Sequence, residues 1–215
     1  MKRRLLRDES GFTLPELLVA MMMMLTVMFA LYSIFDMSIR VFGFGNDKVE
    51  AAGNAWTGLD KMARELRAAY PTDRVNNKTN LFWTAGNPGT KSMPGQTGPI
   101  TFGNDLNGNR RIYDSSTGAI DTGEQITYSL DTTNNRLLRN GEPVAENVKD
   151  ADNPPDGKAL TFTYLDALGN AVTSGDPADI RRVRIKLEVS VNRNVSRGPV
   201  TQTLQTDVTL RNRAG

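Results

Sequence analysis

One carboxylate, Glu16, stands at the start of a long apolar segment. The nineteen residues from Leu17 to Phe35 include no charged side chain. At about 1.5 Å of rise per residue, a helix of this length is close to the thickness of a bilayer core. Ionisable side chains at the edge of a lipid-soluble helix are rare and usually functional. The role of Glu16 is therefore the first question that the sequence raises.

The composition excludes several kinds of chemistry. The 215 residues include neither cysteine nor histidine, which rules out disulfides, thiolate nucleophiles, Cys/His zinc sites and His-based triads. We therefore expect no enzymatic activity, no cofactor and no small-molecule substrate. The formal net charge of +2 comes from the first eleven residues, and the rest of the chain is neutral. No overall basic field indicates a nucleic-acid partner.

A second candidate site lies in the run DLNGN at 105–109, which looks like the start of a calcium loop. Such a loop carries a bidentate Glu eleven residues after its first Asp, and this chain has Ser116 there. Asp114, Asp121 and Glu124 could supply a carboxylate by another geometry. A plain Asx and Gly turn explains the spacing better, so we expect no metal, and calcium near Asp105 stays open as the alternative.

The third candidate is a basic stripe in residues 180–215, which hold eight basic and two acidic residues. Arg182, Arg184 and Lys186 alternate along one face of a predicted strand, and such a row could bind DNA. The stripe lacks the interleaved aromatic residues that stack on single strands. Arginines on the wet face of an edge strand also protect it against aggregation. DNA binding thus stays open as a hypothesis.

The elements around Glu16 indicate a membrane anchor. A secretory signal has an apolar core of 7–15 residues and a small-residue cleavage site, and this apolar run is too long and has no good site. An uncleaved anchor explains the length, and the positive charges of residues 1–11 place the residues after Phe35 outside the cytoplasm. It does not explain Glu16, or why Gly11 stands just before Phe12.

The helical pattern continues beyond the apolar segment. Two glycines at 43 and 45 each cost about 1 kcal/mol relative to alanine, so we expect a kink or a locally melted stretch there. An amphipathic pattern then resumes and ends at Pro71, with the apolar face running from Trp56 to Leu66. Residues 12–70 are thus predicted to form one long helix, with 12–35 in a membrane or filament core.

On the opposite face of this helix, charged residues are spaced for ion pairs. Asp60 with Arg64 and Lys61 with Glu65 both have the favourable i, i+4 spacing. We expect this face to be exposed to solvent.

Residues 71–215 are predicted to form a globular head. A stretch rich in Gly, Pro, Asn and Thr at 71–97 indicates a long loop, anchored only by the apolar residues 81–83. We expect one antiparallel sheet with one face on the helix, which makes the fold class α+β. The predicted strands are Pro99–Phe102, Gln125–Leu130, Arg136–Arg139, Ala159–Leu165, Ile180–Asn192 and Val200–Arg211.

The run GFTLPELLVA at 11–20 resembles the class III signal of type IV prepilins and type II secretion pseudopilins. The family pattern is a short basic leader ending in Gly, then Phe-Thr-Leu-x-Glu, then an apolar helix. The resemblance implies that a membrane prepilin peptidase cuts between Gly11 and Phe12 on the cytoplasmic side. It also implies N-methylation of Phe12, an apolar segment that stays on the processed chain, and a pilin-like fold.

For Glu16, the resemblance implies a partner in another subunit. Cleavage creates an ammonium at Phe12, and Glu16 of one subunit can meet the Phe12 ammonium of its neighbour in a bundle of such helices. In low dielectric a lone charge is heavily penalised and a paired one is tolerated, so the pair sets the register of assembly. A helix-start charge favoured by the helix dipole remains open as the local explanation of Glu16.

Further stretches loosely resemble the minor members of this family. Leu59–Ala69 is similar to the helix end of PilW-type minor pilins and J-type pseudopilins, and Gln125–Leu130 with Leu137–Arg139 is similar to their sheet. The resemblance implies a structural subunit of a type IV pilus or type II secretion-like filament. Its partners would be the prepilin peptidase, other pilins or pseudopilins, and membrane lipid.

The expected location follows from the same argument. Before assembly the chain would cross the cytoplasmic (inner) membrane once, with its N-terminus inside, and it would then join a cell-surface or periplasmic filament. Two alternatives stay open: a DNA-uptake pilin that binds DNA through Arg182, Arg184 and Lys186, and an uncleaved single-span anchored domain.

Overall fold

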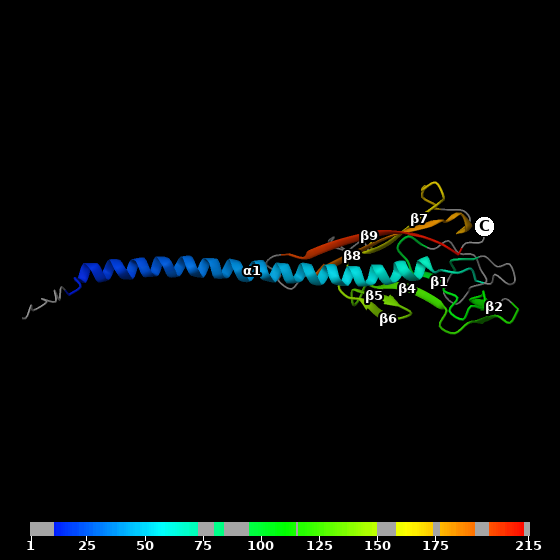
Figure 1. The fold of residues 1–215 in the computed structure, drawn as a ribbon, viewed down its shortest axis with the longest axis horizontal. Coiled ribbons are helices and arrows are strands. Elements are labelled where there is room, and N and C mark those ends of the chain that lie inside the picture. Colours follow the sequence, from blue (N-terminus) through cyan, green and yellow to red (C-terminus); the bar gives the residue numbers. More distant parts are fainter. Residues whose placement is uncertain are drawn as a thin grey trace, which may run out of the picture. The chain divides into compact units, whose positions relative to one another are not determined.

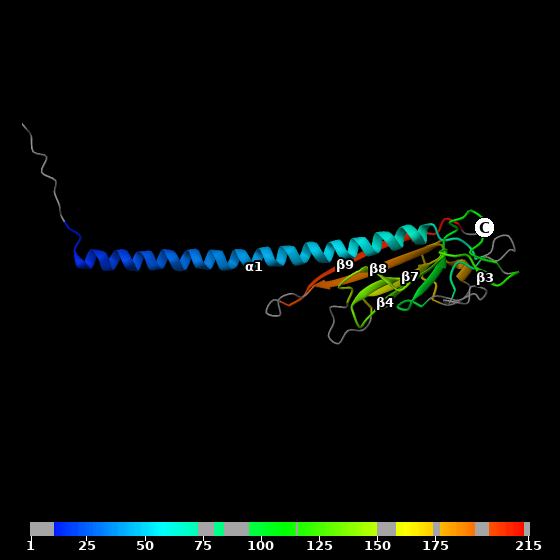
Figure 2. The same cartoon turned by 90° about the horizontal axis from the view of Figure 1, so that it is seen from below.

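The computed structural model describes residues 11–72, 80–83, 95–114, 116–149, 158–173, 177–191 and 198–212. The chain divides into two compact units, Met1–Gly45 and Asn46–Gly215. Most of the leader, most of the predicted loop at 71–97 and residues 192–197 lie outside the described residues. Figures 1 and 2 show the elements from two directions.

Helix α1 (Leu14–Arg67) begins in the first unit and continues into the second. The predicted melted stretch is wrong, because the backbone is helical through both Gly43 and Gly45. Once a helix has formed, each further residue adds a hydrogen bond, and this propagation outweighs the intrinsic cost of two glycines. The second glycine nevertheless marks the division between the two units.

The helix ends three residues earlier than predicted. Ala68 and Ala69 form the last short-range turn, and Tyr70 leaves the helix to donate its N–H to Gly103 O at 2.8 Å. Pro71 follows directly, in agreement with its expected role as a helix terminator. The chain thus passes from the helix straight onto the end of the first strand.

The second unit contains two main antiparallel sheets, where the sequence predicted one. In the first sheet the order is β1-β4-β5-β6, and in the second it is β7-β8-β9, while β2 and β3 form a separate two-stranded ribbon. The bounds are β1 Ile100–Gly103, β2 Tyr113–Asp114, β3 Ala119–Ile120, β4 Gln125–Asp131, β5 Arg136–Arg139, β6 Glu142–Ala145, β7 Leu160–Leu165, β8 Arg182–Val191 and β9 Val200–Thr209, with a 3-10 turn at Pro177–Asp179.

Six of these strands match the predicted ones, and three were missed. The strands β2 and β3 have two residues each, which is too short to show a period. The strand β6 contains Pro143, which cannot donate to a ladder and is tolerated here because β6 is an edge strand. The pairing of β8 with β9 is antiparallel from Arg182↔Thr209 to Val191↔Val200, in agreement with the predicted antiparallel sheet.

The core lies between the second half of α1 and both sheets. The alternation predicted for β8 is confirmed, since Val183, Ile185 and Leu187 are fully buried. Small residues on α1 allow the helix to approach closely: a Cβ at Gly58 would lie 3.0 Å from Leu137 Cδ2 of β5 and 3.3 Å from Leu187 Cδ2 of β8. One helix face therefore contacts both sheets at the same point.

Two predicted features of this helix face are wrong. Trp56 was placed on the buried face, but it is 62% exposed, while its neighbour Ala55 is fully buried. The residues of α1 that are buried nearest to position 56 are Ala55, Gly58 and Leu59, so the indole lies outside the buried face. The buried residues of α1 are Ala51, Ala55, Gly58, Leu59, Met62, Ala63 and Leu66.

Glu65 was expected on the exposed face, paired with Lys61, but it belongs to the interface with the first sheet. Arg139 Nε donates to both of its carboxylate oxygens, at 2.9 and 3.0 Å, and Tyr128 donates its hydroxyl to Oε2 at 2.6 Å. Burial, and then the hydrogen bond to Glu65, raise the pKa of Tyr128. The predicted pair of Asp60 with Arg64 is confirmed at 2.9 Å.

The close contact at Gly58 predicts opposite effects for two helical glycines. Gly58→Leu should lower the free energy of unfolding by about 1–3 kcal/mol, because the added side chain overpacks a filled interface. Gly53→Ala should raise it by up to about 1 kcal/mol, because alanine is the better helix former and a Cβ at Gly53 meets nothing within 4 Å. Unfolding of the full-length chain in detergent, followed by circular dichroism, measures both. Unchanged stability of Gly58→Leu would contradict the packing described.

Candidate functional site: the start of the apolar helix

Residues 13–16 form the start of helix α1. Leu17 N–H donates to Thr13 O at 3.1 Å, which makes Thr13 the N-cap of α1. Pro15 follows in the first turn, where its missing N–H leaves no helical hydrogen bond unmade. The side chain of Glu16, three residues after the cap, accepts hydrogen bonds from Thr13 N–H and from Thr13 Oγ1, both at 3.3 Å and both on Oε2.

This arrangement is one half of a capping box, in which the acidic residue satisfies the N–H of the cap. Glu16 therefore has a local function within its own chain, in line with the helix-start explanation that the sequence left open. A carboxylate can accept about four hydrogen bonds, so the cap uses only part of its capacity. Pairing of the same carboxylate with a second subunit remains a prediction.

Gly11 and Phe12 precede the helix in irregular, exposed backbone. The side chain of Phe12 is 82% exposed, and a Cβ at Gly11 would meet nothing within 4 Å. Nothing in the described part of the chain thus requires glycine at position 11.

The apolar segment after Glu16 is exposed along its whole length. The helix is long and apolar enough to cross a membrane by length and composition, and none of its most apolar stretch is buried. Each Å² of apolar surface left in water costs about 25 cal/mol, so a surface of this size needs lipid or protein against it. Three features therefore lie together at the start of the helix: the accessible backbone of Gly11 and Phe12, the carboxylate of Glu16 and a large exposed apolar surface.

The start of the helix matches a known family motif. Residues 6–32 match the prokaryotic N-terminal methylation motif. The motif supports a type IV pilin-like subunit and implies processing by a prepilin peptidase and assembly with other pilins. Together with the apolar helix, it fits a membrane-anchored pilin.

The methylation motif spans Gly11, Phe12 and Glu16 and much of the apolar segment, and it ends at residue 32. No match to the chain was found among curated proteins or among solved structures. The α+β arrangement of one long N-terminal helix and antiparallel sheets is pilin-like, as predicted.

The three basic residues proposed for DNA lie together on β8, but two of them are ion-paired. Arg184 Nε and Nη2 donate to the two carboxylate oxygens of Asp207 on β9, at 2.7 and 2.9 Å, and Lys186 Nζ lies 3.7 Å from Glu188 Oε2. These pairs neutralise two of the three charges and weaken the case for DNA. The sequence did show both acidic residues, but only the strand register places Asp207 opposite Arg184.

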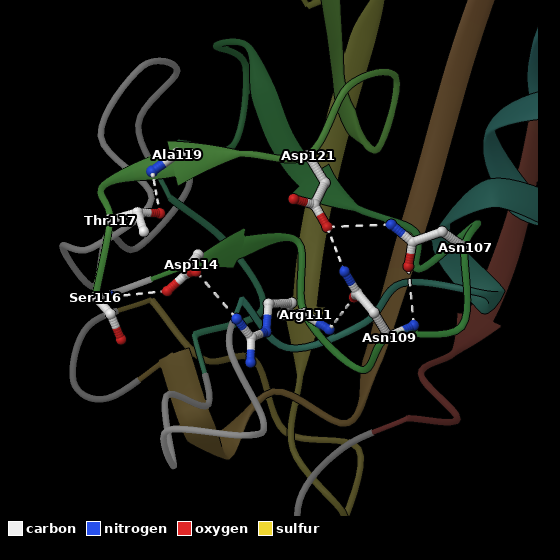
Figure 3. A network of polar contacts seen from close by, with 8 residues as sticks. All are labelled: Asn107, Asn109, Arg111, Asp114, Ser116, Thr117, Ala119 and Asp121. Carbon is white, nitrogen blue, oxygen red and sulfur yellow. Dashed lines mark hydrogen bonds and ion pairs between the residues drawn. The ribbon is translucent and has the colours of Figure 1, made fainter.

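The polar loop that begins at Asp105 is well ordered by its own side chains. Asp121 Oδ2 accepts hydrogen bonds from Asn107 Nδ2 and Asn109 Nδ2, at 3.1 and 2.6 Å (Figure 3). Asp114 turns elsewhere, to Arg111 at 3.0 Å and to the N–H of Ser116. Among the described residues, no three His, Cys, Asp or Glu side chains gather as a metal-binding group.

The pair of Arg184 with Asp207 predicts a small pH-dependent contribution to stability. The hydrogen bonds from Arg184 hold the pKa of Asp207 below its usual value. A lowered pKa stabilises the fold above the ordinary value and loses this effect as the pH falls through the lowered one. Asp207→Asn should therefore cost up to about 1 kcal/mol at neutral pH.

Melting temperatures of the Asp207→Asn variant and of the unchanged chain, measured across a pH series, test this. The two should differ at neutral pH and converge in acid. A difference that persists after Asp207 has been protonated would mean that the variant acts through something other than the ion pair.

Proposed function

We propose that this chain is a structural, non-enzymatic subunit of a type IV pilus or type II secretion-like filament. The observation that carries the proposal is the methylation motif at the start of an exposed, bilayer-length apolar helix. A helix of this kind is covered by lipid before assembly and by the helices of neighbouring subunits afterwards. The chain would cross the inner membrane once, with its N-terminus inside, and then enter a cell-surface or periplasmic filament.

The first step in this proposal is cleavage between Gly11 and Phe12. The exposed, irregular backbone at these residues is accessible to a prepilin peptidase. Cleavage removes the basic leader and leaves an ammonium at Phe12, which is then N-methylated. The apolar helix stays on the processed chain.

The second step is assembly through the N-terminal helices. The new ammonium of one subunit pairs with Glu16 of its neighbour inside a bundle of helices. An unpaired charge in such an apolar environment would be strongly penalised, so only the matched register is stable. Glu16 thus has two successive partners in this mechanism: the Thr13 N–H within its own chain and the amine of another subunit.

We further propose a minor position in the filament, for a minor pilin or minor pseudopilin. The support is the loose resemblance of Leu59–Ala69 and of the β4 and β5 sequences to such subunits. The structure adds one observation about this helix end: Glu65 and Arg139, which lie in the two resembling stretches, bind each other. DNA uptake receives no further support, because Arg184 and Lys186 are ion-paired.

Cleavage is tested at Gly11. Gly11→Val should leave the chain uncut, because a branched side chain blocks the peptidase at the scissile bond. Mass spectrometry of the chain expressed with a prepilin peptidase should find an N-terminus at Phe12 in the unchanged chain and the intact leader in the variant. Gly45→Ala, at a glycine beyond the matched residues, is the control and should be cut normally.

A Gly11→Val chain that is cut normally would refute cleavage at this bond. An unchanged chain that keeps Met1 in the presence of the peptidase would favour the uncleaved single-span anchor.

The pairing of Glu16 is tested by two substitutions that separate its charge from its capping function. Glu16→Gln keeps an acceptor for Thr13 N–H but removes the charge, whereas Glu16→Ala removes both. If the ammonium of a neighbour needs the charge, both variants should be processed and yet enter filaments at least tenfold less than the unchanged chain. The measurement is the amount of the chain in sheared filament fractions.

The matched control is Asp36→Asn, which removes a carboxylate later in the same helix, one that pairs with Arg40 of its own chain. It should assemble normally. Normal assembly of Glu16→Gln alongside failure of Glu16→Ala would assign the residue to helix capping alone.

A further inference from the structure

The two main sheets end in the strands β1, β6, β7 and β9, and the first three of these edges are covered or interrupted. On β1, Gly103 O accepts Tyr70 N–H at 2.8 Å, and on β7, Phe162 N–H donates to Gln96 O at 2.7 Å. The strand β6 contains Pro143, and its register with β5 shifts. Proteins protect edge strands by such means because an open edge is a template for another chain.

The fourth edge strand, β9, has neither kind of protection within the described residues. It pairs with β8 over ten residues in one continuous register, from Thr209 to Val200. It contains no Pro, Lys or Arg, and its one charged residue, Asp207, is bound by Arg184 of β8. A long, regular and nearly uncharged edge of this kind favours the addition of another strand.

The backbone groups on the edge of β9 can be assigned from the register. In an antiparallel pair, residues alternate between bonding to the partner strand and pointing away from it. Leu210 N–H donates to Arg181 O at 3.0 Å, so the even-numbered residues of β9 bond to β8 and the odd-numbered ones point outward. Within the described ranges, the outward N–H and C=O groups of four residues have no protein partner: Thr203, Gln205, Asp207 and Thr209. Each therefore offers one donor and one acceptor to an adjacent chain.

Exposed apolar residues on the second half of α1 border the same edge. Trp56, which is 62% exposed, lines a groove of about 170 Å³ together with Leu204 and Gln205 of β9. Val49 lies seven residues earlier, on the same face of the helix, and is 73% exposed. A chain added to β9 would therefore cover apolar surface on the helix as well as backbone groups on the strand.

The chemistry of this surface selects the kind of chain that fits it. A helix bonds its own backbone groups internally and would leave the edge of β9 unmatched. An extended segment instead presents alternating donors and acceptors along one side, which complement those of β9. Arg67, which also lines the groove, has no ion pair within the described part of the chain, whereas Asp60 is bound by Arg64. The groove thus carries one unbalanced positive charge, which favours an acidic side chain.

We propose that the outer edge of β9, together with Val49 and Trp56 of α1, binds one strand from the head of a neighbouring filament subunit. The added strand bonds to the outward backbone groups of β9, places an apolar side chain against Trp56 and presents an acidic one to Arg67. The inference rests on the proposed function, because a filament holds the heads of neighbouring subunits side by side. It adds a contact between heads to the contact between N-terminal helices.

Hydrogen exchange of the unchanged chain tests this pairing residue by residue. The full-length chain in detergent is compared with the chain in sheared filaments by residue-resolved mass spectrometry. In detergent, the amides of Thr203, Gln205 and Asp207 should exchange rapidly, whereas those of Leu204 and Thr206, which bond to β8, should be protected. In filaments, the three outward amides should exchange at least about tenfold more slowly, because each then donates a hydrogen bond to the added strand.

Gln205→Pro tests whether the edge contributes to assembly. Proline removes the outward N–H without removing a bond to β8, so the melting temperature in detergent should be retained, while incorporation into filaments should fall at least about threefold. Gln205→Thr is the matched control, because threonine keeps the N–H and suits a strand. Trp56→Ser should also lower incorporation, whereas Leu168→Ser, at a residue that is 87% exposed in another loop, should not.

Rapid exchange of the outward amides in filaments that contain the chain would overturn the proposal and leave the filament function intact. Absence of the chain from filaments would refute the proposed function, and this inference with it. Protection that is already present in detergent would also overturn the proposal. It would identify a second copy as the occupant if it grows with chain concentration, and a segment of the same chain if it does not. Normal incorporation of Gln205→Pro, with Thr203 and Asp207 still protected, would equally rule out strand addition.

Discussion

The uncovered apolar surface of the first half of α1 is the constraint on which the other features of the chain depend. None of its most apolar stretch is buried. Water is an unfavourable neighbour for it, so lipid or the helices of other subunits must take that place. Gly11, Phe12 and Glu16 lie directly before this surface, within the residues that match the methylation motif.

In the second half of α1, by contrast, the apolar face is buried against the sheets of its own chain. Ala51, Ala55 and Gly58 are small enough to bring the backbone close to two sheets at once. Glu65 then joins the helix to β4 and β5 through Tyr128 and Arg139. The first half of α1 is thus exposed and apolar, whereas the second half packs within its own chain.

The strongly periodic elements could be predicted, and the short or context-dependent ones could not. Ten-residue strands such as β8 show their alternation in the sequence, because one face of each is buried. The strand β6 was missed because proline disfavours a strand. Pro143 is tolerated only because β6 lies at the edge of its sheet, and the sequence does not show which strands are at an edge. Trp56 and Glu65 were assigned to the wrong faces, because an average helical period cannot tell which neighbours will pack against each residue.

By itself, the sequence determined the candidate processing and assembly residues Gly11, Phe12 and Glu16, since these depend on local order along one chain. It also determined the anchor length and the α+β class, which follow from periodicity. Only the tertiary structure decided which charges are paired, because Arg184 meets Asp207 and Glu65 meets Arg139 through strand register and helix packing. For the same reason it alone brought Asp121 and Glu124 to the loop at Asp105, since those contacts depend on how distant segments fold together.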